Sequence, residues 1–167
     1  MKHLRIGVAA ALGSVAFTLA AAAQTAPAPA PAMQLTELKP GLDDVMTAMV
    51  QPRHLKLHAA AEAKNWHLAA FQLDEPRASF RRIGQYIPKY RNKDFAEAVT
   101  NTMGPNLTAL ESAIKAKDAK AFKTVFADVT ASCNACHVFM EHPFLVIKVP
   151  RGAAALYPDQ EFKAPKD

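Results

Sequence analysis

The chain of 167 residues is poor in several features on which common kinds of protein depend. It has one tryptophan, two cysteines and six glycines, and it contains no glycine-rich phosphate-binding loop. No internal repeat is present, and no segment alternates strictly between apolar and polar residues as paired strands do. No basic run is interleaved with aromatic residues, so nucleic acid is not an expected partner. What is abundant is apolar residues at helical spacing.

Residues 1–34 have the composition of an export signal followed by a linker. Lys2 and Arg5 precede an apolar run from Ile6 to Ala20, and small residues continue to position 23. We expect a cleaved signal peptide over residues 1–23, periplasmic location and no membrane attachment afterwards. An uncleaved anchor is the alternative, although the run is shorter than the about 20 residues of a membrane span. The alanine- and proline-rich residues 24–34 predict an extended linker.

Removal of the signal changes the charge of the chain. The whole sequence has 20 basic and 15 acidic residues, and the signal contains two of the basic ones. The mature chain therefore has 18 basic against 15 acidic residues, a net charge of +3 instead of +5. The basic balance is weak evidence for a nucleic-acid partner.

Four stretches place apolar residues three to four positions apart, which is helical spacing. They cover residues 40–66, 65–87, 92–114 and 118–142, and Asn65, Asn92 and Asp118 are suited to cap the last three. Short connections favour an all-α, antiparallel up-down-up-down four-helix bundle over residues 35–142. Residues 143–167 then form an irregular C-terminal extension packed on the bundle.

Prolines interrupt three of these helical patterns. Pro76 and Pro105 predict bends within helices whose apolar period continues on both sides. Pro52 is ambiguous, because the first helix could be kinked there or a new helix could begin with Pro52 in its first turn. The sequence leaves both readings open.

The two cysteines form the motif Cys133-Asn134-Ala135-Cys136-His137. Positions three and four apart share one side of a helix, so both thiols and the imidazole of His137 can reach one ligand. This spacing is typical of covalent haem attachment. A structural zinc site would lack a ligand, a redox pair is usually found near a strand-helix-strand unit, and a disulfide would leave His137 without a role. We expect one haem c per chain, with His137 as the proximal iron ligand.

Counting residues along each expected helix, starting from the connections between helices, predicts which residues surround this haem. At a rise of about 1.5 Å per residue, His54 and His58 are displaced from His137 along the helix axis, so we expect them to have structural roles. Met46 or Met49 is the candidate distal ligand, and an open distal site is the alternative. The predicted cofactor-binding residues are Cys133, Cys136, His137, Met46, Met49, Phe80, Ile83, Val99 and Met103.

An export signal, four helices and a single Cys-x-x-Cys-His on the last helix resemble the class II c-type cytochromes, which include the cytochromes c′. The resemblance covers about residues 35–142, and its one specific element is Cys133 to His137. It implies a covalent haem, His137 as the proximal ligand, and a distal side that is open or filled by a first-helix methionine. It also admits a homodimer through the first two helices. Pro52 and the long continuation of the chain after His137 depart from the family pattern.

These observations predict an electron carrier and not an enzyme. We expect one-electron transfer between redox partner proteins, with no catalytic residues. The alternative is a five-coordinate haem protein that binds nitric oxide, carbon monoxide or peroxide as a scavenger or sensor. A haem peroxidase is a weaker reading, because the predicted pocket has no polar distal acid or base.

Overall fold

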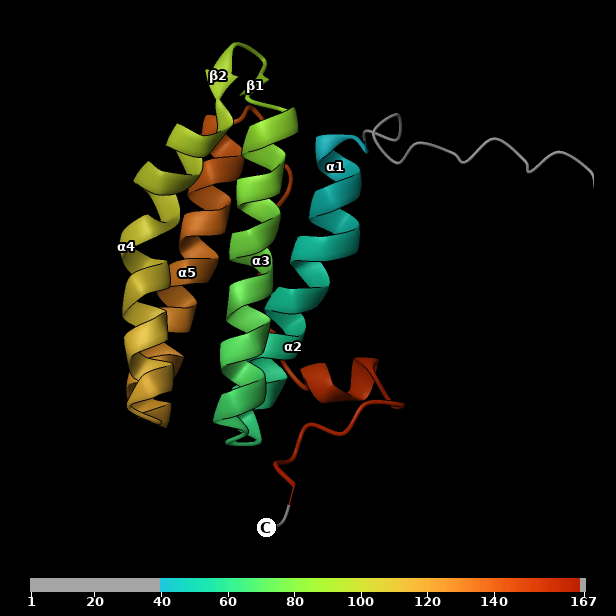
Figure 1. Cartoon of the computed structure of the whole chain (residues 1–167), viewed down its shortest axis with the longest axis vertical. Helices are drawn as coiled ribbons and strands as arrows, with labels where there is room; N and C mark the ends of the chain where they lie inside the picture. The colour runs from blue at the N-terminus through green and yellow to red at the C-terminus, as the bar shows by residue number, and fades with distance from the viewer. Residues whose placement is uncertain (1–39, 166–167) are drawn as a thin grey trace, which may run out of the picture. The chain divides into compact units, whose positions relative to one another are not determined.

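The computed structural model describes residues 40–165, and this part of the chain is mostly helical, as predicted. The predicted signal peptide and linker, and residues 35–39 of the predicted bundle, lie outside the described residues. Within the described part, no helix is both long enough and apolar enough to cross a membrane. Figure 1 shows the long helices α2, α3, α4 and α5 lying alongside one another.

The first helical segment runs without a break through Pro52. It consists of α1 (Leu42–Val45), the π-helical segment η1 (Met46–Val50) and α2 (Gln51–Glu62), which has Pro52 in its first turn. The N–H of Gln51 donates to the carbonyl of Met46, five residues earlier. Because proline has no N–H and its ring collides with the carbonyl four residues before it, the wider π turn relieves the conflict. The reading that places Pro52 in the first turn of a helix agrees with α2, but neither reading anticipated the π turn before it.

The other long helices begin at side-chain caps. Helix α3 (Trp66–Tyr86) is capped by Asn65, whose side chain accepts from the N–H of Leu68 at 3.1 Å, as predicted. Helix α5 (Ala119–Phe139) is capped by Asp118, again as predicted. Helix α4 (Phe95–Lys115) is capped by Asp94, which accepts from the N–H of Glu97 at 2.8 Å, so the prediction of Asn92 was wrong.

The misplaced cap has a local cause. Residues 89–94 form a two-stranded antiparallel hairpin, β1 (Lys89–Tyr90) and β2 (Lys93–Asp94), where the sequence analysis expected only a short connection between helices. Arg91 and Asn92 form its turn, both with positive φ (48° and 63°). Asparagine tolerates this left-handed conformation, and it is therefore used for the turn instead of the cap.

The helices enclose an apolar core to which each contributes. Helix α3 packs against α2 and α4, and α4 packs against α5. Helices α3 and α4 continue through Pro76 and Pro105. The largest fully buried side chains are Phe95, Phe126, Leu73, Ile83, Leu110 and Val45.

The segment after α5 also contributes to the core. Ala153, in the short 3-10 helix η2 (Ala153–Leu156), and Phe162 are buried. Helix η2 contacts α2, and the ammonium of Lys56 on α2 lies 4.5 Å from the ring centre of Tyr157. These contacts fix the extension on the surface of α2.

Arg77 joins α3 to α4 and provides a test of this packing. Its guanidinium donates to the carboxylate of Glu111 and to the backbone carbonyl of Leu107, both at 2.8 Å. Hydrogen bonds from Lys115 and from Arg77 lower the pKa of Glu111 to about 2.

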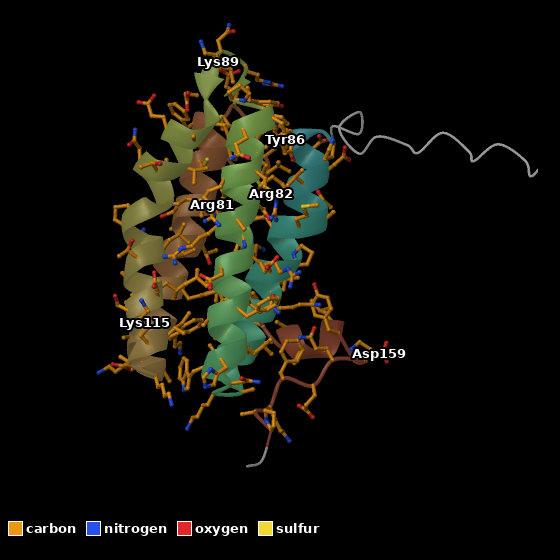
Figure 2. All side chains as sticks on the ribbon, in the orientation of Figure 1. Arg81, Arg82, Tyr86, Lys89, Lys115 and Asp159 are labelled. Atoms are coloured by element: carbon orange, nitrogen blue, oxygen red, sulfur yellow. The ribbon has the colours of Figure 1, made fainter. Side chains whose placement is uncertain are left out.

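We expect Arg77→Ala to lower the free energy of unfolding by about 1–3 kcal/mol, because two charge-assisted hydrogen bonds are lost. The control is Arg81→Ala, at an exposed position on the same helix (Figure 2), which should change stability by less than about 0.5 kcal/mol. Urea denaturation measures both. Equal losses in the two variants would contradict the role assigned to Arg77.

Candidate functional site

The Cys-x-x-Cys-His motif lies in the last two turns of α5. Cys133 and Cys136 are three residues apart on one side of this helix, and both are free thiols. Cys136 is buried and Cys133 is half-buried. The helix ends at Phe139, and Glu141 after it has a positive φ of 66°. The motif is therefore followed at once by a change in chain direction.

A cavity of about 270 Å³ lies against this motif. Its volume is close to the lower end of the about 300–1,000 Å³ that is usual for small-molecule sites. Side chains from α1, η1, α2, α3, α4, α5, β1 and the segment after α5 contribute to its wall. The lining residues are Leu42, Asp43, Met46, Thr47, Val50, Gln51, His54, Phe80, Tyr90, Phe95, Val99, Met103, Cys133, Cys136, His137, Met140, His142, Leu145 and Ile147.

Most of the predicted cofactor-binding residues meet in this wall. From widely separated sequence positions, the chain brings together Cys133, Cys136, His137, Met46, Phe80, Val99 and Met103. The donor set is two thiols and an imidazole from one helix, faced by a thioether, and the remaining wall is largely hydrocarbon. This chemistry fits a haem attached through two thioethers.

Two predicted residues lie elsewhere. Ile83 is fully buried in the helical core and does not reach the cavity. Met49 is 44% exposed and borders a separate surface hollow with Arg53 and Arg82. The π turn explains why Met49 faces away from the cavity. Because a π turn is wider than an α turn, the residue three positions after Met46 no longer lies on the same side of the helix as Met46. Val50, four positions after Met46, stays on the cavity side. Of the two candidate distal methionines, only Met46 lines the cavity.

The orientation of His137 is set by a hydrogen bond that the sequence could not name. Its Nδ1 lies 2.8 Å from the backbone carbonyl oxygen of Leu145. Because a carbonyl only accepts, Nδ1 carries the proton and donates, and Nε2 keeps its lone pair. A histidine that ligates a metal is usually held in this way.

The two thiols do not resemble a redox-active pair. Burial raises the pKa of Cys133 to about 12, with a further contribution from Cys136. Burial also raises the pKa of Cys136, against a hydrogen bond with Thr102. Thiol-exchange pairs have lowered pKa values instead. In residues 40–165, no group of three or more His, Cys, Asp or Glu side chains is placed to hold a metal ion alone.

The wall contains polar residues that the sequence analysis had not placed there. His142 donates from Nδ1 to the carbonyl of Met140 at 2.8 Å, and its Nε2 accepts from the hydroxyl of Tyr90 at 3.2 Å. Leu145 and Ile147 come from the C-terminal segment. They follow the last helical pattern closely but lie outside it, and only the apolar run at residues 144–147 suggested that they contact the rest of the protein.

His54 is the polar wall residue with the most altered environment. Its Nε2 lies 2.9 Å from Oγ1 of Thr130, whose own hydroxyl donates to the carbonyl of Phe126. His54 therefore donates from Nε2, and its ring stacks on Phe126 with centroids 4.7 Å apart. Thr130 precedes His137 by seven residues, about 10 Å along α5. His54 thus lies at the level of Thr130, and the cavity extends far enough along the helices to include it.

The burial of the His54 ring predicts that the stability of the protein depends on pH. Burial lowers its pKa from 6.5 to about 4, with a smaller contribution from His58. Between these values the unfolded chain binds a proton that the folded protein does not, so stability falls as the pH decreases from about 6.5 to about 4. The loss from this residue is at most about 3 kcal/mol.

We expect His54→Gln to lose less stability than the wild type between pH 7 and pH 4, while His67→Asn, at an exposed position, should follow the wild type. Denaturant unfolding curves at several pH values measure this. Parallel curves for His54→Gln and the wild type would show that His54 is not the buried neutral group.

Comparisons with models of protein families, with curated proteins and with solved structures find no match to this chain. The geometry of the cavity and of the residues around it is the basis of the proposal that follows.

Proposed function

We propose that this protein is a c-type cytochrome with one covalently bound haem, which transfers single electrons between protein partners. The observation that carries the proposal is that Cys133, Cys136, His137 and Met46 line one cavity. A bound haem would supply one-electron exchange at its iron. The chain itself attaches the cofactor, orients it and limits its contact with water.

Each residue of the motif has a separate role in this proposal. Cys133 and Cys136 would be joined to the haem through thioethers, each formed when the S–H of one thiol adds across the C=C bond of one vinyl group of the porphyrin, so that no oxidant is needed. His137 ligates through Nε2, because Nδ1 is held by the carbonyl of Leu145. Met46 is the proposed distal ligand, and a thioether opposite histidine favours the reduced state.

We further propose that the long helices form an antiparallel up-down-up-down four-helix bundle. The support is the contact of each long helix with its neighbour in sequence and the shortness of the connections at residues 63–65, 87–94 and 116–118. In bundles of this kind, cofactors are held between facing helices.

The carrier is proposed over a peroxidase for a geometric reason. Peroxidase chemistry requires a polar acid or base within reach of the reacting oxygen. His54 is the imidazole in the wall on the α2 side, but it lies at the level of Thr130 and its Nε2 is already bonded there. We assign it to the structure of the cavity. His142 is a further imidazole in the wall, and both of its ring nitrogens are hydrogen-bonded, to the carbonyl of Met140 and to the hydroxyl of Tyr90.

Partner proteins are proposed to dock near the end of α5. Val138 and Phe139, in the last turn of this helix, are 61% and 48% exposed, next to the motif. Periplasmic location is proposed from the N-terminal sequence, together with a maturation system that joins haem to cysteines there.

The two methionines provide a matched test of the function. In a strain that matures c-type cytochromes, the wild type should be coloured, with low-spin iron and a methionine-to-iron charge-transfer band. Met46→Ala should lose this band. Met49→Ala, one turn away but outside the cavity, should keep it.

Other spectra would point to other conclusions. A high-spin spectrum that changes with carbon monoxide in the wild type would favour the gas-binding alternative. A colourless protein with two free thiols would rule out both haem proposals.

A further inference from the structure

The wall of the cavity is completed by a segment that we call the strap, residues 143–150. It is separated from the end of α5 at Phe139 by residues 140–142, and it has almost no regular secondary structure. Phe144 and Val146 are 75% and 62% exposed and do not line the cavity, whereas Leu145, which is 46% exposed, and the half-buried Ile147 do. Alternate side chains of the strap thus face solvent and cavity, as in any extended chain.

Side-chain packing does little to hold the strap in place, since Lys148 and Val149 are exposed as well. Among the described residues, the strap has one backbone–backbone hydrogen bond, from the N–H of Leu145 to the carbonyl of His142 at 3.0 Å. Its other backbone hydrogen bonds go to side chains of the haem-attachment motif. The position of the strap therefore depends on that motif.

Asn134, the first residue between the two cysteines, makes two of these bonds. Its Nδ2 donates to the carbonyl of Ile147 at 2.9 Å, and its Oδ1 accepts from the N–H of Ile147 at 2.7 Å. One amide thus holds both polar groups of a single strap residue. The third bond is from Nδ1 of His137 to the carbonyl of Leu145, two residues earlier.

We propose that Asn134 is a positioning residue for His137. By fixing Ile147, Asn134 keeps the carbonyl of Leu145 where it accepts the proton of His137 Nδ1. On one turn of α5, Cys133, Cys136 and His137 line the cavity, while Asn134 and the Nδ1 atom of His137 bind the strap. This inference rests on the proposed function for its effect on iron, but not for its effect on the strap.

The consequence concerns how strongly His137 donates electrons. A hydrogen bond from Nδ1 to a carbonyl raises the basicity of the imidazole. A more basic ligand stabilises the oxidised state of the iron. Loss of Asn134 should release the strap, weaken the bond to Leu145 and raise the reduction potential.

The test uses two variants that break the same contact from opposite sides. Asn134→Ala removes both bonds to Ile147. Ile147→Pro removes the N–H that donates to Oδ1 of Asn134, and it leaves the Cys-x-x-Cys-His sequence unchanged. The controls are Asn106→Ala, which removes an amide that bonds Ser132 at 2.7 Å, and Val149→Pro, at an exposed strap position.

Two measurements on the full-length protein separate the parts of the proposal. Amide hydrogen exchange of the strap should accelerate about tenfold in Asn134→Ala and Ile147→Pro, relative to the control at the matching site. The midpoint potential should rise in both. The expected change in the ratio of oxidised to reduced protein is about tenfold, which is about 59 mV for one electron.

The proposal is overturned if the strap exchanges faster while the potential equals that of the controls, because Asn134 is then structural only. It is also overturned if exchange in the strap does not change. If the wild-type protein contains no haem, the proposed function is wrong, and so is the proposed effect of Asn134 on the reduction potential. The exchange measurement would still decide whether Asn134 fixes the strap.

Discussion

One turn of α5 both lines the cavity and binds the segment that follows the helix, and the rest of the site depends on this constraint. Because an α-helix places residues three apart on the same side, Cys133 and Cys136 share the cavity side. Asn134 and the Nδ1 atom of His137 bond the segment that follows the helix, and His137 lines the cavity as well. Any distortion of this turn would displace thiols, imidazole and strap together. The cap at Asp118 and the buried Phe122 and Phe126 hold the helix that carries it.

The opposite wall depends on a local irregularity. Pro52 is incompatible with a regular α-helix at its position, and the chain responds with a π turn just before it. That turn decides which side chains of the first helical segment face the cavity, with Met46 and Val50 inside and Met49 outside. π turns inside helices are often found at functional sites. Here the turn is the reason that two methionines of similar sequence position have different surroundings.

The sequence predicted the helical class because its apolar period is long and regular, and it predicted the caps Asn65 and Asp118 because each immediately precedes such a period. It did not predict the hairpin at residues 89–94, since two-residue strands show no alternation. Counting the helical rise from the chain corners placed Met46, Phe80, Val99 and Met103 in the cavity wall. The same count was wrong for Met49 and Ile83. It gives the distance of a residue along the helix axis, but it does not give the side of the helix on which that residue lies.

The polar part of the site was hidden for a different reason. Leu145 accepts through its backbone carbonyl, which every residue has, and Asn134 occupies a variable position of a motif defined by its cysteines and histidine. Neither carries a signal in its residue type. His54 was expected to be structural because of its distance along the helix axis from His137. The cavity is elongated, however, and its wall includes residues about 10 Å along the helices from His137.

The order of the wall residues along the chain has a consequence for how the protein matures. Every cavity-lining side chain except Met140, His142, Leu145 and Ile147 precedes or belongs to the attachment motif. If the protein is exported N-terminus first and carries haem, as proposed above, the two thiols emerge before these closing residues. Haem delivered at that stage would meet an open cleft, and the last residues to emerge would cover it.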